Sequence, residues 1–127
     1  MKTMLRKLFL SAVTMLSLLS ASCDATDSYL EDEIVGSWGW YYEDDAVFEE
    51  EVYDFDPTGR WTSRYIYENV FGECIYEVDA GTYDIGYGVL ELESNFTGDI
   101  YTFAISIYGD RLLLSSNEYS GEFFRYR

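Results

Sequence analysis

The chain of 127 residues contains no histidine. This absence excludes the Ser–His–Asp and Cys–His catalytic arrangements and every zinc site that depends on histidine. There is also no glycine-rich phosphate-binding loop. Paired carboxylates can hydrolyse glycosides, but 24 Asp and Glu residues in so small a chain give near pairs by chance. We therefore expect no enzyme, no catalytic residue, no cofactor and no metal site.

Basic residues are scarce, and their scarcity limits the partners. Eight Lys and Arg stand against 24 Asp and Glu, for a formal net charge of −16. Lys2, Arg6 and Lys7 lie in the N-terminal leader, which leaves five basic residues, no lysine and a net charge of −19 in the remainder. Such a surface repels nucleic acid and anionic lipid head groups. It provides solubility, or it attracts a basic partner or divalent cations.

The leader has a basic start, an apolar run at residues 8–19 and then small residues. The run is too short for a membrane-spanning helix, which needs roughly 20 residues. We therefore interpret residues 1–22 as an export signal. Cys23, which follows Ser20-Ala21-Ser22, resembles the cysteine of a bacterial lipoprotein signal. Ser20 stands where that family usually has Leu, Val or Ile, and this relaxed pattern resembles the lipoproteins of Bacteroidetes.

This resemblance implies that Cys23 is lipidated and becomes the new N-terminus, which anchors the protein to a membrane through lipid. The alternative is a secretory signal that releases a soluble protein. Residues 23–33 are acidic and show no apolar period, so we expect a flexible tether. Acidic residues after the cysteine also resemble a surface-export signal of this group. The expected location is the bacterial outer membrane, lipid-anchored, at the cell surface, and the alternative for the segment is a plain spacer.

Residues 34–127 form one small domain. Apolar and polar residues alternate with period two, and glycine, aspartate and asparagine clusters interrupt the pattern every eight to twelve residues. This pattern is typical of antiparallel β structure, as a barrel or a sandwich, and closing a barrel removes unpaired strand edges. We expect eight or nine strands, at residues 35–43, 48–56, 60–68, 73–79, 81–86, 89–93, 99–108, 111–115 and 121–127.

The segments IVGSWGW, YDFDPTGRWT, GTYDIGYGVLEL, YTFAISIYGDRLLL and FFRYR resemble, in order and spacing, the small lipocalin-like lipoprotein domains of Bacteroidetes. The resemblance implies an all-β fold, a small antiparallel up-and-down (meander) barrel of about eight strands. In lipocalins the tryptophan of a G-x-W motif closes one end of the barrel under a basic side chain of the last strand. Trp38 matches that tryptophan, and Arg125 or Arg127 matches its cation–π partner.

Aromatic side chains on the inward faces could line a ligand cavity or fill the core, because small barrels pack their interior with side chains. The first functional hypothesis is a binding module for a small apolar or aromatic-stacking ligand. Its alternatives are an accessory subunit of a surface complex, with Tyr41, Tyr119 and Phe123 exposed, and an inhibitor of an enzyme with a basic cleft. The residues nominated for ligand binding are Tyr53, Phe55, Trp61, Tyr65 and Phe103.

Two smaller features leave alternatives open. Cys74 is expected as a small buried hydrophobe, or as a partner in an intermolecular disulfide or in a bond to Cys23. The acidic segments 43–45 and 49–51 are expected as a solvated loop, with calcium binding as the alternative.

Overall fold

The structure is a computed structural model that describes residues 24–117 and 119–126. Residues 1–22, which we interpret as an export signal, Cys23, the expected lipidation site, and Arg127 lie outside the described residues.

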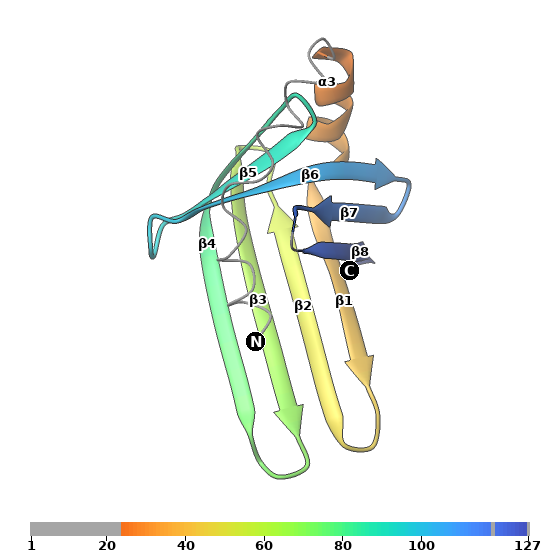
Figure 1. Cartoon of the computed structure of the whole chain (residues 1–127), viewed down its shortest axis with the longest axis vertical. Coiled ribbons are helices and arrows are strands. Elements are labelled where there is room, and N and C mark those ends of the chain that lie inside the picture. The colour runs from red at the N-terminus through yellow and green to blue at the C-terminus, as the bar shows by residue number, and fades with distance from the viewer. Residues whose placement is uncertain (1–23, 118, 127) are drawn as a thin grey trace.

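Eight antiparallel strands follow one another around a closed barrel, and each strand pairs with the next in the sequence (Figure 1). The last strand returns to the first through a short pairing of Ser37, Trp38 and Gly39 with residues 124–126. The predicted antiparallel up-and-down barrel is therefore confirmed. The strands are β1 (Gly36–Glu43), β2 (Val47–Phe55), β3 (Arg60–Asn69), β4 (Cys74–Gly86), β5 (Val89–Ser94), β6 (Ile100–Tyr108), β7 (Arg111–Ser115) and β8 (Ser120–Tyr126).

The two strands expected at residues 73–79 and 81–86 are one continuous strand, β4. Its first part pairs with β3 as far as Thr82, and its second part pairs with β5 from Gly81 onward. A Cβ atom on Gly81 would lie 1.6 Å from the backbone oxygen of Glu93. Gly81 thus permits a close backbone approach where β4 passes from one partner to the other, and it is not a turn.

The acidic segment expected as a flexible tether contains a helix, α3 (Asp24–Glu33). Leu30 and, just after the helix, Ile34 are buried in the core. The Asp27 carboxylate accepts hydrogen bonds from the backbone N–H groups of Tyr87 (2.9 Å) and Gly88 (3.0 Å), which hold α3 against the β4–β5 turn. These two apolar residues, spaced i, i+4, anchor the helix to the core, but two residues are too few to give a recognisable helical periodicity in the sequence.

Within the described ranges, no helix is long and apolar enough to span a membrane.

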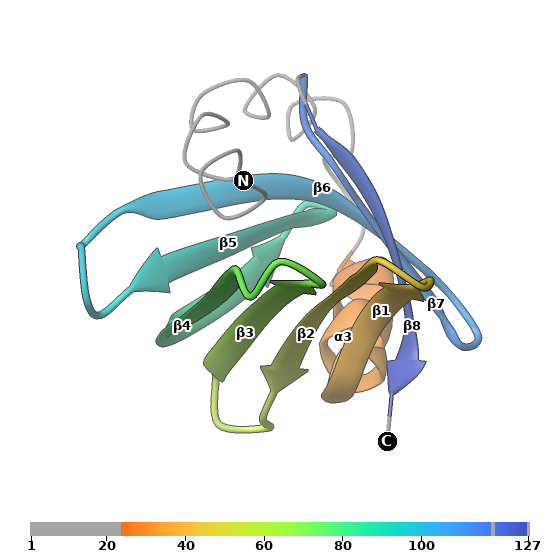
Figure 2. The same cartoon turned by 90° about the horizontal axis from the view of Figure 1, so that it is seen from below.

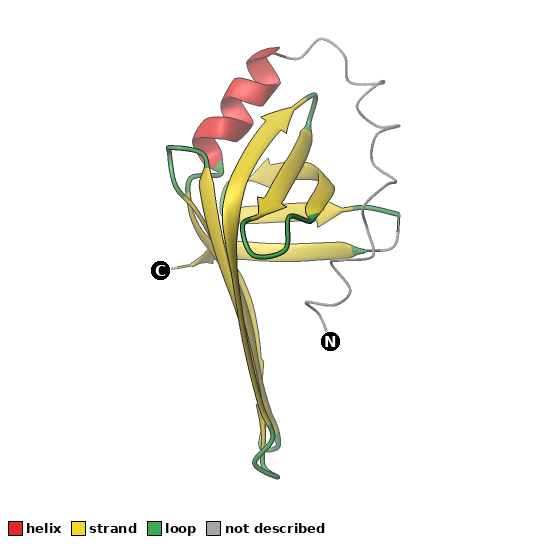
Figure 3. Ribbon diagram, turned by 90° about the vertical axis from the view of Figure 1, so that its left-hand side faces the viewer, coloured by secondary structure: helices red, strands yellow, loops and turns green. Residues whose placement is uncertain are grey.

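The first four strands are longer than the barrel requires. β1 residues beyond Gly39 pair with β2 alone, and β4 residues before Gly81 pair with β3 alone. These ends of β1–β4, called the extension below, continue as a single layer away from α3 (Figure 3). The remaining strands cross the other half of the sheet and close the barrel there (Figure 2). The inner face of the extension is the face that continues from Trp38, Tyr53 and Trp61, which point into the barrel.

Candidate functional site

The five aromatic residues that the alternation nominated are all buried, and four of them lie in the barrel interior. The Tyr53 ring lies 6.1 Å from the ring of Phe55, 6.2 Å from that of Trp61 and 5.4 Å from that of Phe123, between centroids. Phe103 is in the same cluster. Four of the five nominated residues therefore pack in one core. Tyr65 is the next inward-facing residue of β3 after Ser63, two positions further along the strand, at the start of the extension.

The end of the barrel next to α3 is closed by contacts around Trp38. The Trp38 indole N–H donates to the Ile34 carbonyl at 2.7 Å. The guanidinium carbon of Arg125 lies 4.0 Å from the centroid of the Trp38 ring. The same guanidinium donates to the carbonyls of Val35 and Glu33, each at 3.2 Å. One arginine thus links the last strand, the first strand and the end of α3.

Two side chains expected on the surface lie elsewhere. Phe123 is fully buried, because it pairs with the inward-facing Leu112. Tyr119 is partly buried and packs against the core. Tyr41 is exposed, as expected.

The expectation of a buried Cys74 is also wrong. Cys74 is exposed at the start of β4. The alternation on this part of β4 is inverted relative to the apolar pattern: Tyr76 and Val78 are exposed, and Glu77 lies on the inner face opposite Tyr65. The register with β3 forces this inversion, and a single strand's sequence does not reveal register.

The inner face of the extension combines aromatic and acidic side chains. The register places Trp40 beside Glu51, Glu51 beside Tyr65, and Tyr65 beside Glu77. One row, Trp40–Glu51–Tyr65–Glu77, therefore crosses all four strands, and side chains at paired positions on one face lie within contact range. We call it the aromatic–acidic row. The next row outward contains Tyr42, Glu49, Tyr67 and Ile75.

Three carboxylates of this face act electrostatically on the hydroxyl of Tyr65. That hydroxyl donates to Glu49 Oε2 at 2.5 Å, and the Trp40 indole N–H donates to Glu51 Oε1 at 3.2 Å. The pKa of Tyr65 is raised well above its usual range, first by burial, then by the hydrogen bond to Glu49 and by the charges of Glu49, Glu51 and Glu77. Glu51 is only 1% exposed. The Oε1 atom of Glu77 is buried and has no hydrogen-bond partner among the protein atoms described.

The arginines of the described strands lie away from this row. Arg64 occupies the outer face, where it forms an ion pair of 3.8 Å with Glu50. Arg111 pairs with Glu122, and Arg125 covers Trp38. Arg60 is exposed on the same outer face as Arg64. Across residues 24–117 and 119–126, the charged side chains on the inner face of the extension are therefore all acidic.

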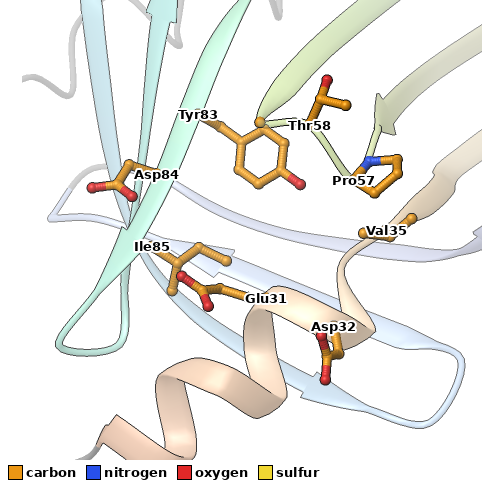
Figure 4. A pocket seen from close by; sticks show the side chains of 9 residues that line it. Glu31, Asp32, Val35, Pro57, Thr58, Tyr83, Asp84 and Ile85 are labelled. Atoms are coloured by element: carbon orange, nitrogen blue, oxygen red, sulfur yellow. The ribbon is translucent and has the colours of Figure 1, made fainter.

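A first hollow, of about 430 Å³, lies between α3, the β2–β3 turn and β4 (Figure 4). The Tyr83 hydroxyl donates to the Asp56 carbonyl at 2.6 Å. Burial, followed by the charges of Asp56 and Glu31, raises the pKa of Tyr83. The hollow can hold a small polar molecule. Its lining consists of Glu31, Asp32, Val35, Pro57, Thr58, Gly59, Tyr83, Asp84 and Ile85.

A second hollow, of about 320 Å³, lies on the outer face of β2–β4. Three of its lining residues are apolar and exposed: Tyr76, Val78 and Phe96, at 63%, 53% and 67%. An apolar group of this kind on a protein surface is a feature of protein–protein contacts.

In the acidic β1–β2 loop, the Asp44 carboxylate stabilises the turn by accepting backbone hydrogen bonds. Asp44 Oδ1 accepts hydrogen bonds from the N–H groups of Ala46 (2.8 Å) and Val47 (2.9 Å), and Tyr42 donates to Asp44 Oδ2 at 2.6 Å. These bonds, that of Tyr42 first, lower the pKa of Asp44. In the part of the chain that the structure describes, no three His, Cys, Asp or Glu side chains are grouped as metal ligands.

No family model matches the chain, and no curated protein is significantly similar to it. The barrel is a fold compatible with a binding module, and the geometry of its surfaces indicates where binding could take place.

Proposed function

We propose that the protein is a binding module that holds a small, aromatic-stacking ligand on the inner face of the extension. The aromatic–acidic row carries this proposal, because it places large aromatic rings and oriented polar groups beyond the point where the barrel closes. Trp40 and Tyr65 are the aromatic residues of the row, and Tyr42 and Tyr67 add two more in the next row. Ligand sites typically combine such rings with a few placed polar groups.

The packed barrel core supports this site mechanically. Tyr53, Phe55, Trp61 and Phe103 form a rigid floor, and Tyr65 connects that floor to the extension. Rigid support keeps binding side chains in position and lowers the entropy lost on binding. In this proposal the nominated residues divide into one ligand contact, Tyr65, and four supporting residues. No catalytic role is assigned to any of them.

We also propose that the protein is a lipocalin-like lipoprotein of an outer membrane, anchored through Cys23. Helix α3 begins at the next residue, Asp24, and it packs at the end of the barrel opposite the extension (Figure 1). A lipid on Cys23 would keep the α3 end near the membrane and direct the extension away from it. The partly exposed side chains of its inner face, such as Trp40 and Tyr67, would then face the surrounding medium.

The test is a fluorescence titration with 1-naphthalenemethanol, a neutral aromatic probe. We expect saturable binding with one probe per protein, and weakening by about three- to tenfold in Trp40→Leu and in Tyr67→Leu, because an aromatic contact contributes about 0.5–1.5 kcal/mol. Tyr76→Leu is the matched control, since Tyr76 lies on the outer face of β4. Unsaturable binding, or equal weakening in Tyr76→Leu, would refute the site.

The second hollow, on the outer face of β2–β4, favours a second candidate function, that of an accessory subunit in a surface complex. Its exposed Tyr76, Val78 and Phe96 could take up an apolar side chain of a partner protein. In that case Phe96→Ser would abolish assembly with the partner and leave naphthalenemethanol binding unchanged.

A further inference from the structure

We infer that the ligand of the inner face carries a positively charged nitrogen group, an ammonium or a guanidinium, next to its aromatic part, and that Glu77 receives this group. The inference rests on the proposed function and names the chemical class of its ligand. Three observations carry it: the unsatisfied oxygen of Glu77, the use of the neighbouring donors, and the sign of the charge on this face.

The first observation is the buried oxygen of Glu77. A buried carboxylate oxygen without a hydrogen bond costs free energy, because it has lost its water. An ionised carboxylate only accepts hydrogen bonds, so a donor must supply what is missing. Glu77 lies in β4 directly opposite Tyr65, on the face that the proposed ligand covers. Glu77 as a whole is only partly buried, so a ligand on this face can bring a donor to its carboxylate.

The second observation is that the neighbouring donors serve other carboxylates. The Tyr65 hydroxyl donates to Glu49, and the Trp40 indole N–H donates to Glu51. The hydrogen bonds of these two donors therefore go to Glu49 and Glu51, and the Oε1 atom of Glu77 is left to an external donor.

The third observation is the charge of the face. Glu49, Glu51 and Glu77 lie on the same face of the extension as Tyr65, and all three act electrostatically on its hydroxyl. Arg64, the neighbour of Tyr65 in β3, lies on the outer face of the sheet, where it forms an ion pair with Glu50. A neutral donor would satisfy one hydrogen bond, whereas a cation would also gain the Coulomb attraction of the three carboxylates and a cation–π contact with the rings.

The experiment compares two probes of nearly equal shape, 1-naphthylmethylamine, which is protonated at pH 7, and 1-naphthalenemethanol. We expect the ammonium to bind the protein as isolated from cells about tenfold or more tightly than the alcohol, since a hydrogen bond to a charged group contributes about that factor. Glu77→Gln should remove this advantage and preserve binding of the alcohol, which also shows that the variant is folded. Glu68→Gln is the matched control, with the same charge change on the outer face of β3.

The other outcomes are informative in different ways. Equal binding of the two probes would overturn the inference and leave the proposed function standing, whereas failure of both probes to bind would overturn both. An equal loss in Glu68→Gln would show general attraction by the net charge and overturn the inference. A loss in Glu31→Gln, with Glu77→Gln unaffected, would assign the cation to the hollow beneath α3 and overturn it as well.

Discussion

The guanidinium of Arg125 lies over the indole of Trp38, with its central carbon 4.0 Å from the ring centroid. Trp38 is fully buried, while the Arg125 side chain is one-third exposed and also forms ion pairs with Glu33 (3.6 Å) and Asp110 (3.7 Å). This contact joins the short β1–β8 seam, which is the last pairing needed to close the barrel. Closure at this seam stabilises the sheet from which the extension projects.

Removing the Trp38 ring should destabilise the protein strongly. We expect Trp38→Ala to lower the free energy of unfolding by about 3–5 kcal/mol, because it leaves a cavity at the barrel end. In a double-mutant cycle with Arg125→Ala, measured by urea unfolding, the coupling energy should be about 0.5–2 kcal/mol. An unchanged urea midpoint in Trp38→Ala would contradict the closing role.

The continuity of β4 depends on a residue without a side chain. Gly81→Ala should destabilise the protein or prevent its folding, because the added methyl group would meet the Glu93 backbone at 1.6 Å. Gly86→Ala is the control, since no atom lies within 4 Å of a Cβ at that position and it is in the same strand. Thermal unfolding of the two variants provides the comparison, and similar melting temperatures would show that β4 does not approach β5 so closely at Gly81.

Alternation in the sequence was sufficient to predict the barrel and the inward direction of Tyr53, Trp61 and Phe103, because a strand has a side-chain period of two. It could not predict the aromatic–acidic row, since the row depends on the register of four strands. Glu51 and Glu77 come from strands that do not pair with each other. In the sequence of a single strand, a charged residue such as glutamate is expected on the solvent-exposed face. Helix α3 was missed because only Leu30 and Ile34 seat it, within a segment that is otherwise acidic.

Alkaline conditions should weaken the fold through partly buried tyrosines. Burial, followed by the hydrogen bond to Glu50, raises the pKa of Tyr126 to about 12, against about 10 in the unfolded chain. Between these values the unfolded state has lost a proton that the folded state keeps, so the free energy of unfolding falls as pH rises from about 10 to about 12. Urea unfolding across this range should show a smaller fall in Tyr126→Phe, and an equal fall would contradict the assignment.

The proposed anchor makes a separate prediction about Cys23. Cells labelled with a fatty acid should incorporate the label into the natural protein and not into Cys23→Ala, which should remain unprocessed or become soluble. Lipidation is the chemical step that requires the thiol, and Cys74→Ala should therefore incorporate the label normally. Equal labelling of the natural protein and Cys23→Ala would reject the lipid anchor.

The three indole N–H groups provide the most direct test of ligand binding on the inner face. Trp38 and Trp61 donate to backbone carbonyls, of Ile34 at 2.7 Å and of Glu93 at 3.3 Å, whereas Trp40 donates to the Glu51 carboxylate at 3.2 Å in the aromatic–acidic row. We would record the three indole cross-peaks in a ¹H–¹⁵N NMR spectrum during titration with 1-naphthylmethylamine. The account predicts that the Trp40 peak shifts and saturates while the other two move little. A stationary Trp40 peak at saturating probe, with the Trp38 or Trp61 peak shifting instead, would contradict it.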